Sequence, residues 1–547
     1  MATEAGEAKA SIHWFRHGLR LHDNPALLEA VCSYENFYPI FIFDGHVAGT
    51  SICGFNRWRF LHDCLKDLDE QFRQCGGMLY CFTGDPVEVL RKQIKEWNVK
   101  MISFEMDPEP IWQDRDNRVK ALCNELNIAC VERVSHTLWN PHVVISENGG
   151  SPPLTYSLFV EVVERVGHPP HPLPKPNLSS LKIPYTEAMD KLYSLQPLEH
   201  YASPDIPEQE QKIWYGGETK ALELFQVRLR SELEAFKSDI VMVNQYNPKL
   251  LEPPLSLSAY LRFGALSIRR FYWEIHELYT EAQHKISSNH VTAQLMWREY
   301  FYTMSVSNEN FDKMENNPIC LRINWDKDPE KLRAWTEGET GYPWIDACMK
   351  QLKREGWIHQ VGRHSVACFL TRGDLWISWE EGLQVFYKYL LDADWSVCSG
   401  NWMWVSSSAF EKFLQCPSCF CPVNYGRRMD PKGQFVKRYL PVLAKMPLRY
   451  LFSPHKAPLE VQEKAGCIIG KDYPNPIVNH KEASTRNKAY MDEIVGKFLN
   501  NVPPHCTPSK EEEIAEFAWL EPVQEVPCDG KESCRKAEVY YDIATTA

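Results

Sequence analysis

The sequence lacks any uninterrupted apolar run approaching the ~20 residues that a membrane span requires. Its start is polar and acidic, without the apolar stretch of a signal peptide. The chain also has fewer basic than acidic residues, with 60 Lys and Arg against 72 Asp and Glu, which gives a net charge of −12. The 18 cysteines follow no disulfide framework. These absences predict a cytoplasmic and nuclear protein with reduced thiols, no membrane partner and no constitutive nucleic-acid partner, although a local basic groove stays possible.

Aromatic residues are abundant, at 12% of the chain with 18 tryptophans among 547 residues. Such a content fits either large apolar cores or a π-rich cofactor pocket, and composition alone does not choose between them. The length allows two to four domains.

Residues 1–135 alternate short apolar segments with amphipathic ones, a pattern that predicts a Rossmann-like parallel α/β sheet. No Gly-x-Gly-x-x-Gly follows the first strand, so a dinucleotide on this sheet is not expected. The expected strands are Ser11–Phe15, Tyr38–Phe43, Met78–Phe82, Lys100–Phe104 and Ile128–Val131. The expected helices between them are Phe55–Gln74, Pro86–Trp97 and Ile111–Leu126.

Three further regions follow. Residues 136–215 form an interdomain connector, because proline and turn residues dominate from Ser151 to Tyr215. Residues 216–500 carry helical periodicity and predict a large all-helical domain, in which Ala293–Met304 and Trp344–Glu355 are clear helices. After the break at Val502-Pro-Pro, residues 501–547 form a polar C-terminal tail.

Five motifs, in order along the chain, resemble the DNA photolyase and cryptochrome superfamily. They are Trp14-Phe-Arg-His-Gly-Leu-Arg-Leu-His-Asp-Asn-Pro25, Trp297-Arg-Glu-Tyr-Phe301, Thr340-Gly-Tyr-Pro343, Asp392-Ala-Asp-Trp-Ser396 and Gly400-Asn-Trp-Met-Trp404. Within it, the chain is most similar to the insect-type, light-sensitive cryptochromes. The resemblance implies an α/β domain of the photolyase antenna type, a helical domain that binds FAD and a regulatory tail. It implies no second, antenna chromophore.

The resemblance also assigns residues to the FAD site. Taken singly, each has an ordinary alternative as a helix cap or a surface ion pair, and the order of the motifs is what favours the flavin. Hydroxyls and a cation would hold the pyrophosphate, and an Arg–Asp pair would lie beside the flavin ring. The implied FAD residues are Arg228, Ser256, Ser258, Gln294, Gln360, Arg363, Asp392, Ala393, Asp394 and Cys398.

Cys398 stands where photolyases usually have asparagine and plant cryptochromes have aspartate. A thiol has a pKa near ~8.5, and burial raises it, so it is a poor proton donor to a reduced flavin. The expected photoproduct is therefore an anionic semiquinone. Alternatively, Cys398 only fills space in the core, as a small buried apolar residue.

Four tryptophans match the family's electron-transfer chain, namely Trp402, Trp379 and Trp325 from the flavin outward, with Trp376 as a fourth member. Each alone could be core packing. Electron tunnelling weakens exponentially with distance, so a buried flavin needs closely spaced oxidisable rings to draw electrons from the surface.

Repair of DNA is not expected. Trp297 matches the aromatic that stacks on a flipped-out lesion, but Gln294 replaces the glutamate of dimer photolyases. Six-four photolyases need two histidines, and here those positions hold Gln360 and His364, so the general acid is missing. Gln360 also departs from insect cryptochromes, in which histidine is more usual.

Two segments near the C-terminus carry local signals. Cys416, Cys419 and Cys421 could contribute to a zinc site, but no second Cys-x-x-Cys is near, so no metal is expected. In the tail, Phe517 and Trp519 resemble the aromatic cluster that fills the lesion pocket of insect cryptochromes, with Ala518 in place of the middle ring.

The sequence therefore predicts a non-enzymatic blue-light photoreceptor. The resemblance implies light-dependent binding to the clock protein Timeless and to a ubiquitin-ligase substrate receptor. Two alternatives stay open: a six-four DNA photolyase, and a light-independent transcriptional repressor like the vertebrate-type cryptochromes.

Overall fold

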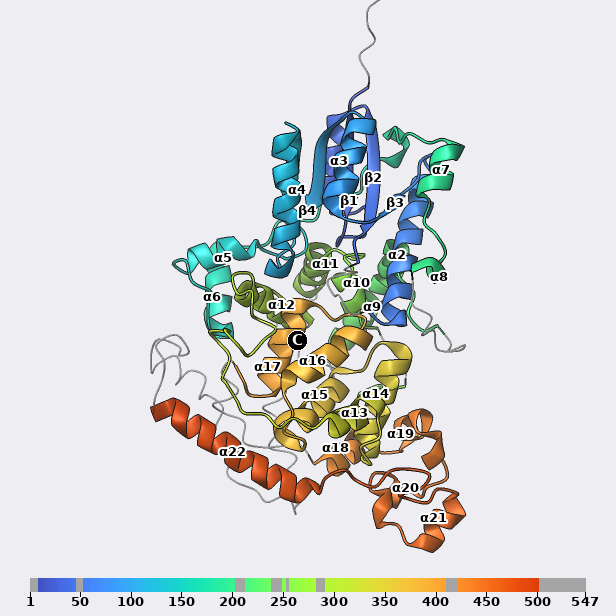
Figure 1. Ribbon diagram of the computed structural model, residues 1–547, viewed down its shortest axis with the longest axis vertical. Coiled ribbons are helices and arrows are strands. Elements are labelled where there is room, and N and C mark those ends of the chain that lie inside the picture. The colour runs from blue at the N-terminus through green and yellow to red at the C-terminus, as the bar shows by residue number, and fades with distance from the viewer. Residues whose placement is uncertain are drawn as a thin grey trace, which may run out of the picture.

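The computed structural model describes residues 8–45, 53–201, 212–237, 248–251, 255–281, 291–409 and 421–500. Figure 1 shows the α/β domain at one end of the molecule and the helices of the second domain gathered at the other. The predicted division into an α/β domain followed by a helical domain is confirmed.

The α/β domain is built on a five-stranded parallel sheet in the order β3-β2-β1-β4-β5. The central strand β1 is buried along its whole length, as expected for a parallel sheet covered on both faces. The strands are β1 (Ala10–Phe15), β2 (Asn36–Phe43), β3 (Tyr80–Thr83), β4 (Val99–Glu105) and β5 (Ala129–Arg133). All five lie where the sequence predicted them, with ends shifted by one or two residues.

Three of the four helices of this domain match their predictions, and α1 was not predicted. They are α1 (Pro25–Ser33), α2 (Phe55–Arg73), α3 (Pro86–Glu96) and α4 (Gln113–Glu125). Local sequence fixes their beginnings: Asp85 accepts hydrogen bonds from the N–H groups of Val87 and Glu88, and Pro86 opens α3. The predicted helix from Ile111 begins with a separate 3₁₀ turn, Pro110–Trp112.

The connector is more helical than its proline content suggested. It contains α5 (Pro141–Glu147), α6 (Tyr156–Val166), α7 (Glu187–Tyr193) and α8 (Leu198–Tyr201). Helix α6 is capped by Thr155 and buries Phe159, Val162 and Val163. Its spacing of apolar residues is helical, but the prolines on both sides obscured that signal in the sequence.

The helical domain follows the connector, and its first helix begins at Glu218. Its first helices are α9 (Glu218–Lys237), α10 (Ser258–Arg262), α11 (Ile268–Glu281), α12 (Val291–Ser305), α13 (Pro329–Glu337), α14 (Pro343–Glu355), α15 (Gln360–Cys368), α16 (Trp379–Tyr389) and α17 (Trp395–Val405). The remaining helices are α18 (Pro422–Met429), α19 (Gln434–Tyr439), α20 (Leu448–Leu451), α21 (Leu459–Ala465) and α22 (His480–Asn500). Of the helices in the described ranges, none is both long and apolar enough to cross a membrane.

The two domains are joined by buried charges. Asp23 accepts two hydrogen bonds from Arg269, at 2.9 and 2.6 Å. Arg20 reaches across from the α/β domain to donate to the carbonyl of Gly264 at 3.0 Å. Gly264 lies so close to Gly18 that a Cβ on it would stand 2.2 Å from the Gly18 nitrogen. The domains therefore meet backbone to backbone, in one fixed arrangement.

Helix α22 follows the outside of the helical domain (Figure 1). Its first residue, His480, places Nδ1 2.7 Å from a carboxylate oxygen of Asp374. Burial opposes the charge of the imidazole, but Asp374 and then Cys421 raise the pKa of His480 to about 10. This ion pair holds the start of α22 against the domain.

Candidate functional site

The loop between α16 and α17 carries Asp392, Ala393 and Asp394, and its backbone is held from the other domain. Arg57 of α2 donates to the carbonyls of Leu390 and Ala393, at 2.8 and 3.0 Å. Arg262 donates to the same Ala393 carbonyl at 3.1 Å. These bonds fix where the two aspartates can point.

Asp392 is the centre of a polar cluster that brings four predicted FAD residues together. Arg363 of α15 donates to both its oxygens, at 3.0 and 2.8 Å, in the bidentate geometry that guanidinium and carboxylate favour. The hydroxyl of Ser258 donates to Asp392 and lies 2.8 Å from the hydroxyl of Ser256. Arg363 and Ser258 thus bind the Asp392 carboxylate directly, and Ser256 is joined to it through Ser258.

Arg228 approaches this cluster in space through Leu255, although it precedes Leu255 by 27 residues in the chain. Its Nε donates to Glu232 at 2.7 Å, one turn along α9, and one of its terminal nitrogens lies 3.5 Å from the carbonyl of Leu255, which precedes Ser256. Gln294 is half-buried on α12.

Asp394 caps α17, where it accepts a hydrogen bond from the Val397 N–H. Its second oxygen accepts a hydrogen bond from the hydroxyl of Tyr302 at 3.1 Å. That hydroxyl also lies 2.9 Å from Nε2 of His136. Tyr302 and His136, which the sequence did not single out, therefore set the orientation of Asp394.

Cys398 lies one turn after Asp394 on α17 and is 8% exposed. Burial, and then the charges of Asp394 and Asp392, raise the pKa of its thiol above the ordinary value. The thiol therefore keeps its proton at neutral pH.

Gln360 opens α15, three residues before Arg363. Its side-chain nitrogen is buried and has no hydrogen-bond partner within the described part of the chain. A buried donor of this kind is costly unless something accepts its hydrogen bond. An acceptor-rich group such as a flavin ring would meet that need. Arg228, Ser256 and Ser258 carry the cation and hydroxyls suited to a pyrophosphate, and the Arg363–Asp392 pair is suited to the flavin side. The residues present therefore fit FAD.

The four predicted tryptophans lie on segments that contact one another in order. Trp402 lies one turn after Cys398 on α17. Its ring lies against Gly382 of α16, the helix that Trp379 begins. Just before Trp379, Ile377 forms a parallel bridge with Asp326, and the rings of Trp325 and Trp376 lie with centroids 4.8 Å apart.

Trp376 adopts a left-handed backbone conformation, with φ of 56°, that is unfavourable for a bulky residue. The turn is held by its carbonyl, which accepts from Asp326 N–H at 2.8 Å, and by its indole N–H, which donates to Asn324 at 3.0 Å. Strain of this kind persists only where the surroundings fix it. Here it places the Trp376 ring against Trp325.

Gly382 sets the approach of Trp402 to α16. A Cβ at this position would lie 2.2 Å from the Trp402 ring carbon Cη2. We expect Gly382→Ala to push that ring from α16 and to lower the free energy of unfolding by about 1–3 kcal/mol, as overpacking does. Chemical denaturation of Gly382→Ala and of the unaltered protein measures the loss. Equal stability of Gly382→Ala and the unaltered protein would contradict the close packing.

Trp297 stacks on Tyr156 of α6, with centroids 4.0 Å apart and planes 7° apart, and meets Trp404 edge-on at 4.9 Å. His364 is buried on α15. Tyr156 was missed because it lies in the segment interpreted as a connector. One face of the Trp297 ring is therefore covered by the chain's own tyrosine.

Several predicted residues fall outside the described residues, namely Phe517, Trp519, Cys416 and Cys419. Cys421 is described and precedes α18 as its N-cap. Within the described ranges, no group of three His, Cys, Asp or Glu side chains could hold a metal ion.

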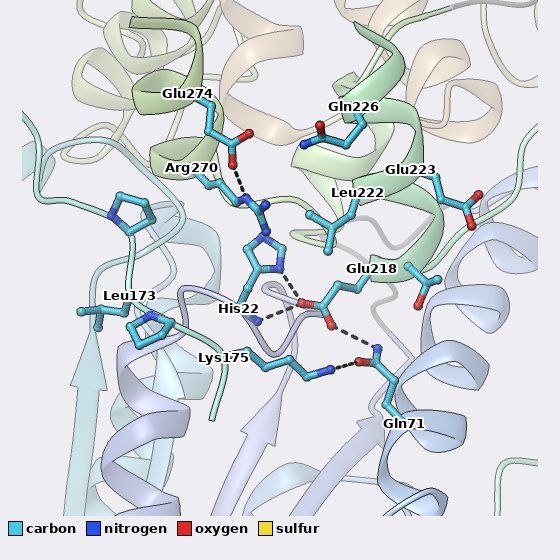
Figure 2. Close-up of a pocket in the computed structure, with 13 residues that line it drawn as sticks. His22, Gln71, Leu173, Lys175, Glu218, Leu222, Glu223, Gln226, Arg270 and Glu274 are labelled. Atoms are coloured by element: carbon cyan, nitrogen blue, oxygen red, sulfur yellow. Dashed lines mark hydrogen bonds and ion pairs between the residues drawn. The ribbon is translucent and has the colours of Figure 1, made fainter. Parts of the chain in front are cut away.

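A cavity of about 730 Å³ lies between the connector and helices α9 and α11, and none of the predicted FAD residues lines it. Figure 2 shows its polar side chains turned toward one another. Glu218 accepts from the backbone and ring of His22 and from Gln71, and Arg270 pairs with Glu274. These groups satisfy each other and join the domains.

Known proteins match the chain across both domains. A family model described as DNA photolyase matches residues 11–177, and one described as the FAD binding domain of DNA photolyase matches residues 291–493. Cryptochrome-1 of Aedes aegypti is 50% identical over 93% of this chain and 98% of its own length. Cryptochrome-1 of Sylvia borin is 46% identical over 88% of this chain and 78% of its own.

Solved structures agree in fold. A bacterial class III photolyase from Agrobacterium tumefaciens superposes with a TM-score of 0.76 at 28% identity, covering 90% of this chain and 99% of the photolyase. Because the α/β domain, the FAD-binding helical domain and nearly full-length relatives all agree, this chain belongs to the DNA photolyase and cryptochrome family.

Proposed function

We propose that this protein is an insect-type cryptochrome, a blue-light photoreceptor that holds FAD and draws electrons to it through Trp402, Trp379, Trp325 and Trp376. The observation that carries the proposal is the ordered contact of the four tryptophan-bearing segments, which begins one helical turn from Cys398. FAD, when bound, supplies light absorption and a one-electron acceptor. The chain supplies the path for the electrons.

The residues beside the flavin also determine whether it gains a proton. The Cys398 thiol keeps its proton because burial raises its pKa, and Asp392 is held by two bonds from Arg363. The thiol is therefore not suited to donate a proton at neutral pH. We therefore propose that the reduced flavin stays anionic, which would make a persistent negative charge in this pocket the light signal.

Cys398→Asp should reverse this outcome. An aspartate buried beside Asp394 and Asp392 would have its pKa raised and would carry a proton that it can donate. We expect the illuminated protein to gain the long-wavelength absorption of a protonated, one-electron-reduced flavin. Cys398→Ser, which keeps the size and a retained proton, should give the unaltered spectrum. An unchanged spectrum in Cys398→Asp, with full flavin content, would contradict a role for this position in protonation.

DNA repair is not part of the proposal. Gln360 has no proton to donate near neutral pH, and the face of Trp297 is stacked by Tyr156. The photolyase from Agrobacterium tumefaciens is 28% identical to this chain, whereas Cryptochrome-1 of Aedes aegypti is 50% identical. The vertebrate-type alternative, a light-independent repressor, is favoured by one observation, the 46% identity to the Sylvia borin protein.

Signalling would occur through light-dependent protein binding in the cytoplasm and nucleus. By resemblance, the partners are Timeless and a ubiquitin-ligase substrate receptor, which would connect the protein to the circadian clock. The similarity to the Aedes aegypti protein over 93% of this chain supports the assignment.

The absorption spectrum of the purified protein, recorded before and after blue light, tests the proposal. We expect stoichiometric oxidised flavin that bleaches to the anionic reduced form, together with partner capture in light only. Lesion repair under light would favour a photolyase. Purification with little flavin and light-independent capture would favour the repressor.

A further inference from the structure

The end of the tryptophan path is covered by helix α22. Trp376 is only 2% exposed, and it packs with Ile323 and with Met491 of α22 in a small apolar cluster separate from the main core. Trp325 and Ile494 lie at the edge of this cluster. If Trp376 is oxidised, its ring is therefore covered by helix α22 and is not in contact with water.

Tyr490 is the aromatic residue of α22 that meets this point. Its ring centroid lies 5.2 Å from that of Trp376, with the planes inclined at 62°. This spacing is close to the 4.8 Å between Trp325 and Trp376. Tyr490 is also 42% exposed, so its side chain spans from the buried indole to solvent.

Exposure matters because a phenol is oxidised most easily when it can lose its proton. Trp376 donates its indole N–H to the Asn324 carbonyl and is enclosed, so its indole has no direct route for a proton to water. The Tyr490 phenol has that route through its exposed part. The guanidinium of Arg486, 5.9 Å from the Tyr490 ring centroid, disfavours a lasting positive charge on the ring. A neutral product is therefore favoured over a tyrosine cation.

We propose that Tyr490 is the terminal electron donor of the path, which moves the oxidised site from the protein core to helix α22. This inference rests on the proposed function, since light-excited FAD is the oxidant. In the last step the phenol gives one electron to oxidised Trp376, the phenolic O–H bond breaks and the proton passes to water. Trp376 is restored, and a neutral tyrosyl radical is left on α22.

Loss of the proton makes the charge separation long-lived. The electron can return from the flavin side only if Tyr490 regains a proton, whereas an oxidised Trp376 could be refilled directly. Without the phenol, the vacancy would stay on Trp376 or Trp325, and recombination would be faster.

The test uses the full-length, FAD-loaded protein with Tyr490→Phe, which keeps the ring but removes the ionisable hydroxyl. Tyr185→Phe is the matched control, because Tyr185 is also 42% exposed but lies in the connector. Flash-induced electron paramagnetic resonance should show a tyrosyl radical in the unaltered protein and in Tyr185→Phe, and a tryptophan radical alone in Tyr490→Phe. The charge-separated state should decay about tenfold faster in Tyr490→Phe.

A nitroso spin trap, which forms covalent adducts with tyrosyl radicals, gives a second readout by peptide mapping. We expect an adduct on Tyr490 after illumination and none in darkness or in Trp402→Phe. A tyrosyl signal that persists in Tyr490→Phe, or equal decay in all three proteins, would overturn the inference while leaving the tryptophan path intact. Photoreduction that survives in Trp402→Phe would instead overturn the proposed function.

Discussion

Replacement of Trp402 by phenylalanine lowers the rate of flavin photoreduction by about 100-fold or more, equivalent to a barrier higher by at least ~2.7 kcal/mol. Trp402 is the first ring of the path, on the same helix as Cys398 and one turn beyond it. Phenylalanine fills most of the same space but is too difficult to oxidise to pass an electron. The next ring, Trp379, would then have to supply the flavin directly over a longer distance.

The measurement is the rate of loss of oxidised-flavin absorption under constant blue light without oxygen. Trp344→Phe is the matched control, since Trp344 is equally buried but packs against Tyr425 and Phe435, away from the path. Both variants must bind the same amount of FAD. Rapid bleaching of Trp402→Phe would contradict the assignment of the path.

The second large effect is expected at Asp392. Asp392→Ala leaves Arg363 and Ser258 without the carboxylate that orients them. An arginine that loses its buried partner is strongly unfavourable, and its guanidinium will no longer be directed toward the ligand. We expect FAD affinity to fall at least about tenfold, equivalent to ~1.4 kcal/mol. Asp392→Asn, which keeps one acceptor oxygen, should lose less.

Flavin fluorescence released during equilibrium dialysis measures this affinity. Glu339→Ala is a suitable comparison, because Glu339 pairs with Arg333 at the exposed surface, where such pairs contribute little. If Asp392→Ala binds FAD as tightly as Glu339→Ala, the Asp392 cluster does not form the flavin site.

The sheet could be predicted from the sequence because its central strands are short apolar runs between polar turns. Strand β2, with its run Phe37–Phe43, is an example, since both faces of a covered parallel sheet are apolar. Helix α6 could not be predicted equally well, because a single short helix between prolines gives a weak periodic signal. Because α6 was not predicted, its residue Tyr156, which stacks on Trp297, was not predicted as part of the site either.

The residues of the candidate site also fall into those that the sequence could predict and those that it could not. The resemblance implied roles for Arg363 and Asp392, which match the family's motifs, and for Cys398, which stands at a position that differs within the family. It gave no sign of Tyr302 or Gly382, which act by position alone: one orients Asp394, and the other makes room for Trp402. Contacts between residues far apart in the chain depend on tertiary packing, and one sequence carries no direct record of them.

The bonds from Arg57 to the carbonyls of Leu390 and Ala393 have a consequence for engineering. Glu109, also from the α/β domain, accepts the N–H of Trp395 at 3.0 Å. A chimaera that exchanges only the helical domain with a relative would separate these carbonyls and this N–H from the side chains that bind them here. The exchangeable unit is therefore larger than the flavin-binding domain, and a working graft must carry Arg57 and Glu109 with it.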